Sequence, residues 1–258
     1  LLILSSDHQI KDTNNFQLAI KSSIDSALKD NLIIFGVPPT YPATGYGYIK
    51  SEKQLNHDQF TPSTVQEFIE KPDEETAQYF VKDKKYSWNS GMFVFKANAI
   101  IGELQRLAPE IYFSCKNAIK NSTKDLDFQR LDEKAMRDCP SISIDIAIME
   151  KTKLGSVVPL DAQWSDIGTW HSLWENQKKD NEGNLSQGKV ILEDVKNSIF
   201  RSEGRLIVGM GVRNLVAVET DDAVLIMNKD KSQGIKNLVT LMKEKGFTEA
   251  SEHKRGYR

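Results

Sequence analysis

Residues 1–7 read Leu-Leu-Ile-Leu-Ser-Ser-Asp. The apolar run Leu1–Leu4, followed by two serines, predicts a buried parallel strand that ends in a polar turn. An acid at the carboxyl end of such a strand points into the crevice where open α/β sheets bind ligands. Asp7 is therefore a candidate site residue, although a single acid after a strand more often caps a turn.

A second acid, Asp166, lies in the segment Trp164-Ser165-Asp166-Ile167-Gly168-Thr169-Trp170. Two carboxylates in one crevice repel each other unless a cation sits between them. Mg²⁺ usually takes one or two carboxylates together with substrate phosphates. If Asp7 and Asp166 share such a site, their carboxyl groups should lie within roughly 4 to 8 Å of each other.

The composition excludes several classes of protein. The chain has 258 residues, a formal charge of −2 and 27% charged residues, which gives no electrostatic case for binding nucleic acid or anionic membranes. Its apolar runs are strand-sized, so none is expected to span a membrane. Two cysteines and four histidines occur without ligand-like spacing. A reduced, cytoplasmic protein without a zinc site is the expectation.

The first part of the chain alternates strands and helices, which is typical of a doubly wound α/β sheet. The predicted strands are 1–6, 32–37, 46–50, 64–70, 92–95 and 157–160. The predicted helices are 13–29, 73–82, 97–119 with a break at Pro109, and 143–151.

The pattern changes after about residue 183. Short β-branched runs occur at 189–192, 198–200, 206–208, 215–219 and 223–227, and helical periodicity returns only at 235–245. We therefore expect an α/β catalytic domain at 1–182, a small all-β domain with a terminal helix at 183–250, and a linker at 251–258.

Motifs between Asp7 and Gly168 point to one family. In order they are Asp7-His8, Gly45-Tyr46-Gly47-Tyr48, Glu67-Phe68-Ile69-Glu70-Lys71-Pro72, Trp88-Asn89-Ser90-Gly91-Met92-Phe93, Ser143-Ile144-Asp145 and Trp164-Ser165-Asp166-Ile167-Gly168. The series resembles the sugar-1-phosphate nucleotidyltransferases, and most closely the mannose-1-phosphate guanylyltransferases. The most similar form is the bacterial one that is often fused to a mannose-6-phosphate isomerase domain.

The resemblance implies a Rossmann-like nucleotidyltransferase sheet, truncated at its N-terminus, followed by a β-helix-like appendage. The family's Gly-rich, Arg-bearing loop, which holds the nucleoside triphosphate, has no counterpart in this sequence. The last residues resemble the linker that leads into the isomerase domain. The expectation is that the parent protein carries the activity and that these residues alone form no GDP-mannose.

The implied reaction is attack by an oxygen of mannose 1-phosphate on the α-phosphorus of GTP, which releases pyrophosphate. Asp7 and Asp166 would hold Mg²⁺. Lys71 would place a cation against the phosphates, with Pro72 fixing the turn behind it. A homodimer is the expected assembly.

The resemblance also implies a set of substrate-binding residues: Gly47, Tyr46, Glu70, Asn89, Gly91 and Asp145. Glu70 would accept hydrogen bonds from sugar hydroxyls, and Asn89 can both donate and accept. Gly47 would let its backbone N–H approach the sugar. Local sequence alone allows plainer roles, namely an ordinary loop for Gly47 and a favourable helix-dipole charge for Asp145.

Three other interpretations stay open. The chain could use another sugar phosphate, such as glucose 1-phosphate. It could also be a non-catalytic regulatory subunit, although such a subunit would be expected to lose Asp7, Lys71 or Asp166. A metal-dependent glycosyltransferase would normally show two acids around one residue, and Asp7-His8-Gln9 does not.

Overall fold

The computed structural model describes residues 1–56 and 59–251. The chain divides into two compact units. The larger unit holds Leu1–Ser6 and Ile10–Trp164, and the β-rich unit holds Asp7–Gln9 and the chain from Ser165 onward. Among the described residues, no helix is both long and apolar enough to cross a membrane.

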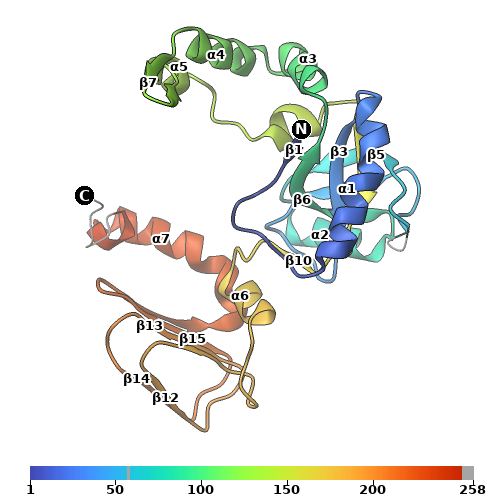
Figure 1. Cartoon of the computed structure of the whole chain (residues 1–258). Coiled ribbons are helices and arrows are strands. Elements are labelled where there is room, and N and C mark those ends of the chain that lie inside the picture. The colour runs from blue at the N-terminus through green and yellow to red at the C-terminus, as the bar shows by residue number, and fades with distance from the viewer. Residues whose placement is uncertain (57–58, 252–258) are drawn as a thin grey trace. The chain divides into compact units, whose positions relative to one another are not determined.

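A six-stranded mixed sheet forms the centre of the larger unit (Figure 1). In spatial order its strands are β1 (Leu2–Ile3), β6 (Tyr86–Val94), β3 (Leu32–Val37), β9 (Gly155–Pro159), β5 (Ser63–Ile69) and β4 (Tyr48–Ser51). β3 and β9 are parallel, whereas β6 runs antiparallel to β1, β3 and β4. β3 is buried along its whole length, as its continuous apolar run predicts.

Helices cover both faces of this sheet. α1 (Thr13–Leu28) and α2 (Glu74–Lys82) pack on one face through Ala19, Ala77 and Phe80. α3 (Ala97–Leu107) and the π-helix η1 (Asp145–Met149) pack on the other face. The sequence predicted a helix at 143–151. The helix in the structure covers only Asp145–Met149, and because it is a π-helix it is wider than an α-helix.

The first strand differs from its prediction. β1 contains only Leu2–Ile3, pairs antiparallel with β6, and leaves Leu1–Leu4 between 42% and 65% exposed. The prediction of a buried parallel strand at 1–6 was wrong for these residues. An apolar run predicts burial only where neighbours cover it, and β1 lies at the edge of the sheet with one strand beside it.

The segment after α3 contains elements that the sequence did not predict. α4 (Pro109–Lys120) begins at Pro109, which confirms the predicted break. A hairpin of β7 (Thr123–Asp125) and β8 (Phe128–Arg130) follows, and then the short helix α5 (Glu133–Arg137). These strands are short and largely polar, so they carry no clear alternation.

β2 (Gln9–Ile10) and β10 (Trp164–Ser165) pair in a separate two-stranded sheet. Asp7 lies two residues before β2, and Asp166 directly follows β10. The pairing therefore brings the chain segments that carry these two acids side by side.

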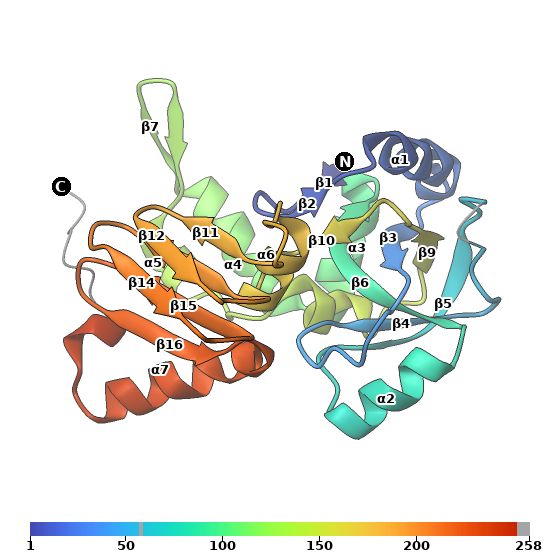
Figure 2. The same ribbon diagram turned by 90° about the horizontal axis from the view of Figure 1, so that it is seen from below.

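The β-rich unit contains two stacked layers of mainly parallel strands (Figure 2). One layer is β12 (Val190–Glu193) and β14 (Ile207–Met210). The other is β11 (Leu185–Gln187), β13 (Ile199–Ser202), β15 (Leu215–Glu219) and β16 (Val224–Asn228), with β16 antiparallel to β15.

A repeat sets the length of the later coils in this unit. Leu185 pairs with Ile199, which lies 14 residues further on, whereas Val190 pairs with Ile207 and Ile199 with Val216, so the following coils are 17 residues apart. The left-handed corner residues follow the same spacing, Asn197 with φ 51° and Asn214 with φ 54°. The sequence signal is Asp194-Val195-Lys196-Asn197 against Gly211-Val212-Arg213-Asn214, a longer repeat than the six-residue one by which a β-helix is usually predicted.

Two helices complete the unit. α6 (Trp170–Asn176) packs Trp170 and Trp174 against Ile199, Val216 and Val218. The predicted helix 235–245 is confirmed as α7 (Ile235–Glu244), which follows the short 3₁₀ helix η2 (Lys229–Gly234) and precedes another, η3 (Thr248–Ala250). Of the predicted linker 251–258, residues 252–258 lie outside the described residues.

Candidate active site

Gly47, in the loop before β4, lies under the carboxylate of Glu70. A Cβ atom added to Gly47 would stand 2.5 Å from Glu70 Oε2. Any larger residue would therefore displace that carboxylate. Glu70 Oε2 is buried and has no hydrogen-bond partner among the described residues. A buried acceptor without a partner is costly, and it suits a site where a ligand donates the missing hydrogen bond.

Lys71 follows Glu70 in a strained turn at the end of β5. Its φ is 49°, and residues before proline rarely adopt helical or left-handed conformations. Lys71 Nζ donates to Glu70 Oε1 at 2.6 Å and remains 57% exposed. The cation is thus held at the edge of the site by its neighbour, where an incoming anion can reach it.

Asn89 connects three segments. It lies in β6, which extends further towards its N-terminus than the predicted strand 92–95. Its backbone N–H donates to the carbonyl of Gly47 at 2.8 Å, and its Nδ2 donates to Asp145 Oδ1 at 2.9 Å. Its Oδ1 accepts from the N–H of Gly91 at 2.8 Å, and Gly91 has a φ of 69° that favours glycine.

Asp145 opens the π-helix η1 beside Glu70. Burial raises the pKa of the Asp145 carboxyl group, and the nearby charge of Glu70 raises it further. The hydrogen bond from Asn89 favours the ionised form and opposes this rise. π-turns occur often at functional sites. The structure therefore brings together Gly47, Glu70, Lys71, Asn89, Gly91 and Asp145, six of the residues expected from the sequence.

Tyr46 belongs to an aromatic cluster next to this group. Its ring lies edge-on to Trp88 and Trp164, with ring centroids 5.1 and 5.5 Å apart. Trp88 is buried. A direct contact between Tyr46 and a sugar stays a prediction.

Asp166 lies in the β-rich unit in a tight turn. Its Oδ1 accepts from the N–H of Gly168 at 3.0 Å, and a Cβ added to Gly168 would stand 2.5 Å from Oδ2. Ile167, between them, has a φ of 47°. Gly168 is needed because the carboxylate folds back over it.

Asp7 is exposed and belongs to the same unit as Asp166. The pairing of β2 with β10 is consistent with a shared site, but the separation of the two carboxyl groups stays a prediction. Within residues 1–56 and 59–251, no group of three or more Asp, Glu, His or Cys side chains forms a ready cation site. A cation held by two carboxylates and substrate oxygens needs no such group.

Two family profiles match successive parts of the chain. The nucleotidyl transferase family profile matches residues 1–183, and a mannose-phosphate isomerase/GMP-like β-helix domain profile matches residues 188–242. The alginate biosynthesis protein AlgA of Pseudomonas fluorescens is 43% identical over the whole chain. A mannose-1-phosphate guanylyltransferase of Salmonella muenchen is 43% identical over 98% of it. The chain spans about half, 53%, of the length of each of these relatives.

Solved structures show the same fold. A Thermus thermophilus structure, described as a mannose-1-phosphate geranyltransferase, superposes with a TM-score of 0.78 at 25% identity, covering 94% of this chain and 69% of that one. A mannose-6-phosphate isomerase from Helicobacter pylori is 40% identical, with a TM-score of 0.58, covering 64% of this chain and 63% of that one.

Proposed function

The chain belongs to the nucleotidyl transferase family, and on that premise we propose that the protein joins mannose 1-phosphate to GTP, giving GDP-mannose and pyrophosphate. The relatives named above as a mannose-1-phosphate guanylyltransferase and an alginate biosynthesis protein support this assignment. GDP-mannose would then supply activated sugar for polysaccharide synthesis. A fused mannose-6-phosphate isomerase activity is proposed for the parent on the same grounds.

The observation that carries the proposal is the buried Oε2 of Glu70 above Gly47, which has no hydrogen-bond partner within residues 1–56 and 59–251. A sugar hydroxyl is a donor of the right size to supply the missing hydrogen bond. Asn89 and Asp145 lie beside it and offer further donors and acceptors. Lys71, at the edge of the same group, suits the phosphate of the sugar.

The reaction needs little acid–base help from the protein. Both substrates are polyanions, so the main tasks are to hold them in line and to neutralise charge. Glu70, Asn89 and Asp145 would orient the hexose through its hydroxyls. Lys71 would hold the phosphate whose oxygen attacks the α-phosphorus of GTP.

We propose that Asp7 and Asp166 hold Mg²⁺. The ion, when bound, would neutralise phosphate charge, and two carboxylates with substrate oxygens form a suitable donor set. Asp166→Asn in the full-length protein keeps the turn with Gly168 and removes half of the anionic charge. Turnover should then fall at least about 100-fold, with weaker effects on sugar-phosphate binding. An unchanged kcat at saturating Mg²⁺ would reject this role.

Substrate choice separates the proposal from its alternatives. In the full-length protein, pyrophosphate release should require mannose 1-phosphate and GTP together. Faster release with glucose 1-phosphate would favour a different sugar nucleotidyltransferase. No release with any pair of sugar phosphate and nucleoside triphosphate would favour the regulatory subunit.

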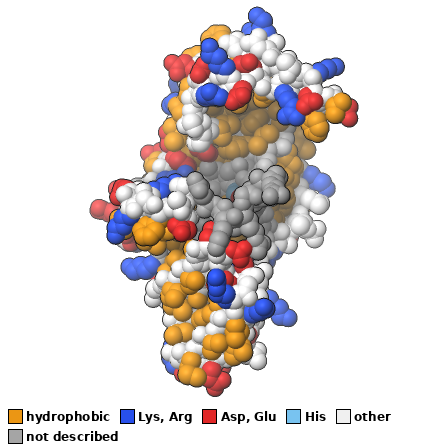
Figure 3. Space-filling model, turned by 90° about the vertical axis from the view of Figure 1, so that its left-hand side faces the viewer, with side chains coloured by type: hydrophobic (Ala, Val, Ile, Leu, Met, Phe, Trp, Pro, Cys, Tyr) orange, Lys and Arg blue, Asp and Glu red, His pale blue; other side chains and the backbone are white. Residues whose placement is uncertain are grey.

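We also propose a cytoplasmic homodimer. Apolar side chains gather on the lower part of the face shown in Figure 3, where the β-rich unit lies. Its exposed apolar residues include Ile191, Val208, Met210, Val224 and Ile226, between 58% and 72% exposed. Light scattering of the full-length protein would test the assembly, and a monomer at micromolar concentration would contradict it.

A further inference from the structure

The residues of the candidate site form a ring of hydrogen bonds and one close contact, and the ring passes through one further side chain, Glu150. Along one side, the Gly47 carbonyl accepts from the Asn89 N–H, and Asn89 Nδ2 donates to Asp145. The Asp145 carbonyl then accepts from the N–H of Glu150 at 2.9 Å, which closes the π-turn. Glu150 was not among the residues singled out from the sequence.

Glu150 completes the ring on the other side. Its Oε1 accepts from the backbone N–H of Glu70 at 3.4 Å. Glu70 Oε2, in turn, lies against Gly47, where the ring began. Two segments separated by 80 residues are therefore tied together by one carboxylate.

The Glu70–Lys71 turn, which Glu150 contacts, has a strained backbone. Lys71 has a left-handed φ of 49° directly before Pro72, a conformation that costs roughly 1 to 3 kcal/mol for most residues. Such strain persists only where the surroundings fix the backbone. The ion pair of Lys71 with Glu70 lies within the turn itself, whereas the hydrogen bond with Glu150 joins the turn to a distant segment.

We propose that Glu150 is a positioning residue, which fixes the Glu70–Lys71 turn so that the Glu70 carboxylate and the Lys71 cation meet the sugar phosphate together. The proposal rests on the proposed function for its kinetic consequence. Glu150 touches no substrate in this scheme and acts through Glu70. Its effect should therefore fall on the binding of the sugar phosphate more than on the binding of GTP.

The test compares three variants of the full-length protein with the wild type. Glu150→Ala removes the acceptor, Glu150→Gln keeps an acceptor oxygen, and Lys151→Ala is an exposed neighbour that serves as a control. The first measurement is hydrogen exchange of the Glu70 amide, and the second is the KM for mannose 1-phosphate beside kcat and the KM for GTP.

In Glu150→Ala the Glu70 amide should exchange about tenfold faster, and the KM for mannose 1-phosphate should rise about tenfold, the effect of one lost hydrogen bond. kcat and the KM for GTP should change less than about threefold, and Glu150→Gln and Lys151→Ala should stay within about twofold of the wild type. Wild-type exchange of the Glu70 amide in Glu150→Ala would overturn the proposal. Equal increases in the exchange rate and in the KM for mannose 1-phosphate in Glu150→Gln would also overturn it.

The two measurements separate this inference from the proposed function. A wild-type protein that does not turn over mannose 1-phosphate rejects the proposed function. The exchange of the Glu70 amide needs no substrate and still decides whether Glu150 holds the turn.

Discussion

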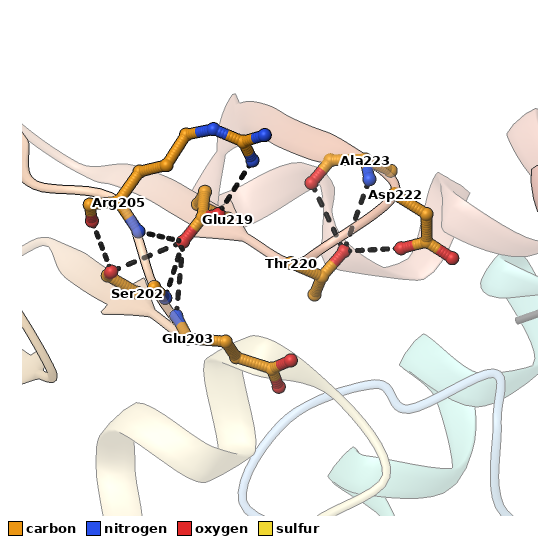
Figure 4. Close-up of polar contacts among 8 residues, drawn as sticks. Ser202, Glu203, Arg205, Glu219, Thr220, Asp222 and Ala223 are labelled. Carbon is orange, nitrogen blue, oxygen red and sulfur yellow. Dashed lines mark hydrogen bonds and ion pairs between the residues drawn. The ribbon is translucent and has the colours of Figure 1, made fainter. Parts of the chain in front are cut away.

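Two carboxylates with little exposed surface, Glu219 in the β-rich unit and Glu70 in the larger unit, have opposite surroundings. The Glu219 side chain is 4% exposed, and its Oε2 accepts from the backbone N–H groups of Glu203, Gly204 and Arg205 at 3.0 to 3.1 Å (Figure 4). Its Oε1 accepts from Arg205 Nη1 at 3.0 Å. The Glu70 side chain is 13% exposed, and its Oε2 has no partner among the described residues.

The difference in hydrogen bonding indicates a structural role for Glu219 and is consistent with the ligand-binding role proposed for Glu70. A buried carboxylate whose oxygens are both satisfied fixes the backbone around it, and here Glu219 joins the turn after β13 to the end of β15. A carboxylate with an oxygen left over lowers stability until a ligand supplies a donor. The β-rich unit thus uses Glu219 to hold a coil, whereas Glu70 Oε2 of the larger unit has no such partner among the described residues.

The largest expected effect comes from removing Lys71, the cation beside Glu70. Lys71→Ala in the full-length protein should lower kcat/KM for mannose 1-phosphate by about 100- to 1000-fold, since charge stabilisation of a phosphate is lost. Its melting temperature should stay within about 2 °C, because exposed ion pairs contribute little. Lys96→Ala is the matched control, since Lys96 is 40% exposed and pairs with Asp30. Equal losses of activity in Lys71→Ala and Lys96→Ala would show that the loss is not specific to the candidate site.

Glu70→Gln should lower kcat/KM for mannose 1-phosphate by about 10- to 100-fold, because an amide oxygen accepts a weaker hydrogen bond than a carboxylate. Stability should change little, since Oε2 has no partner among the described residues and the exposed ion pair of Oε1 with Lys71 contributes little. Steady-state kinetics and thermal melts of this variant and of Glu67→Gln, three residues earlier in β5, would check the expectation. A melting temperature lowered by more than about 5 °C would assign Glu70 a structural role.

Glu219→Gln should show the reverse pattern, a loss of stability with little direct effect on sugar-phosphate binding. We expect the melting temperature at pH 7 to fall by about 5 °C or more, with exposed Glu193→Gln as the control. Hydrogen bonds from the Gly204 N–H and its neighbours hold the pKa of Glu219 below its usual range. Its stabilisation is therefore complete above the ordinary carboxyl pKa and is lost as pH falls through the lowered value. Thermal melts from pH 7 to pH 3 should accordingly bring the variant and the wild type together.

The smallest effect is expected for Asp145→Asn, and it has the opposite sign. Burial, together with the charge of Glu70, raises the pKa of Asp145, so the folded state loses stability as pH rises from the ordinary carboxyl pKa through the raised one. The neutral amide keeps an oxygen that can accept from Asn89 and should raise the melting temperature at pH 7 by about 1 to 3 °C. A lower melting temperature would place Asp145 with Glu219 among the structural acids.

Much of the fold could be predicted from local pattern. The buried strand β3, the helices α1 and α7 and the break at Pro109 follow from periodicity and proline chemistry, which act within a few residues. The 17-residue repeat of the β-rich unit is also visible in the sequence. Its two copies have side chains of similar size and the same turn asparagine, but few identical residues. The hairpin β7–β8 was missed because polar strands of three residues give no periodic signal.

The sequence by itself indicated the candidate chemistry, because motifs such as Glu70-Lys71-Pro72 and Asp166-Ile167-Gly168 carry the carboxylates, the lysine and the glycine in the order of the resembled family. Only the tertiary structure decided that Leu1–Leu4 lie at an exposed sheet edge and that Glu150 reaches the Glu70 amide. It also decided that both carboxylate oxygens of Glu219 accept hydrogen bonds, whereas Glu70 Oε2 accepts none from the described residues. Burial and hydrogen-bond satisfaction depend on which distant segments meet. The contacts between distant segments are set by the packing of the whole unit, so they cannot be predicted from a local stretch of sequence.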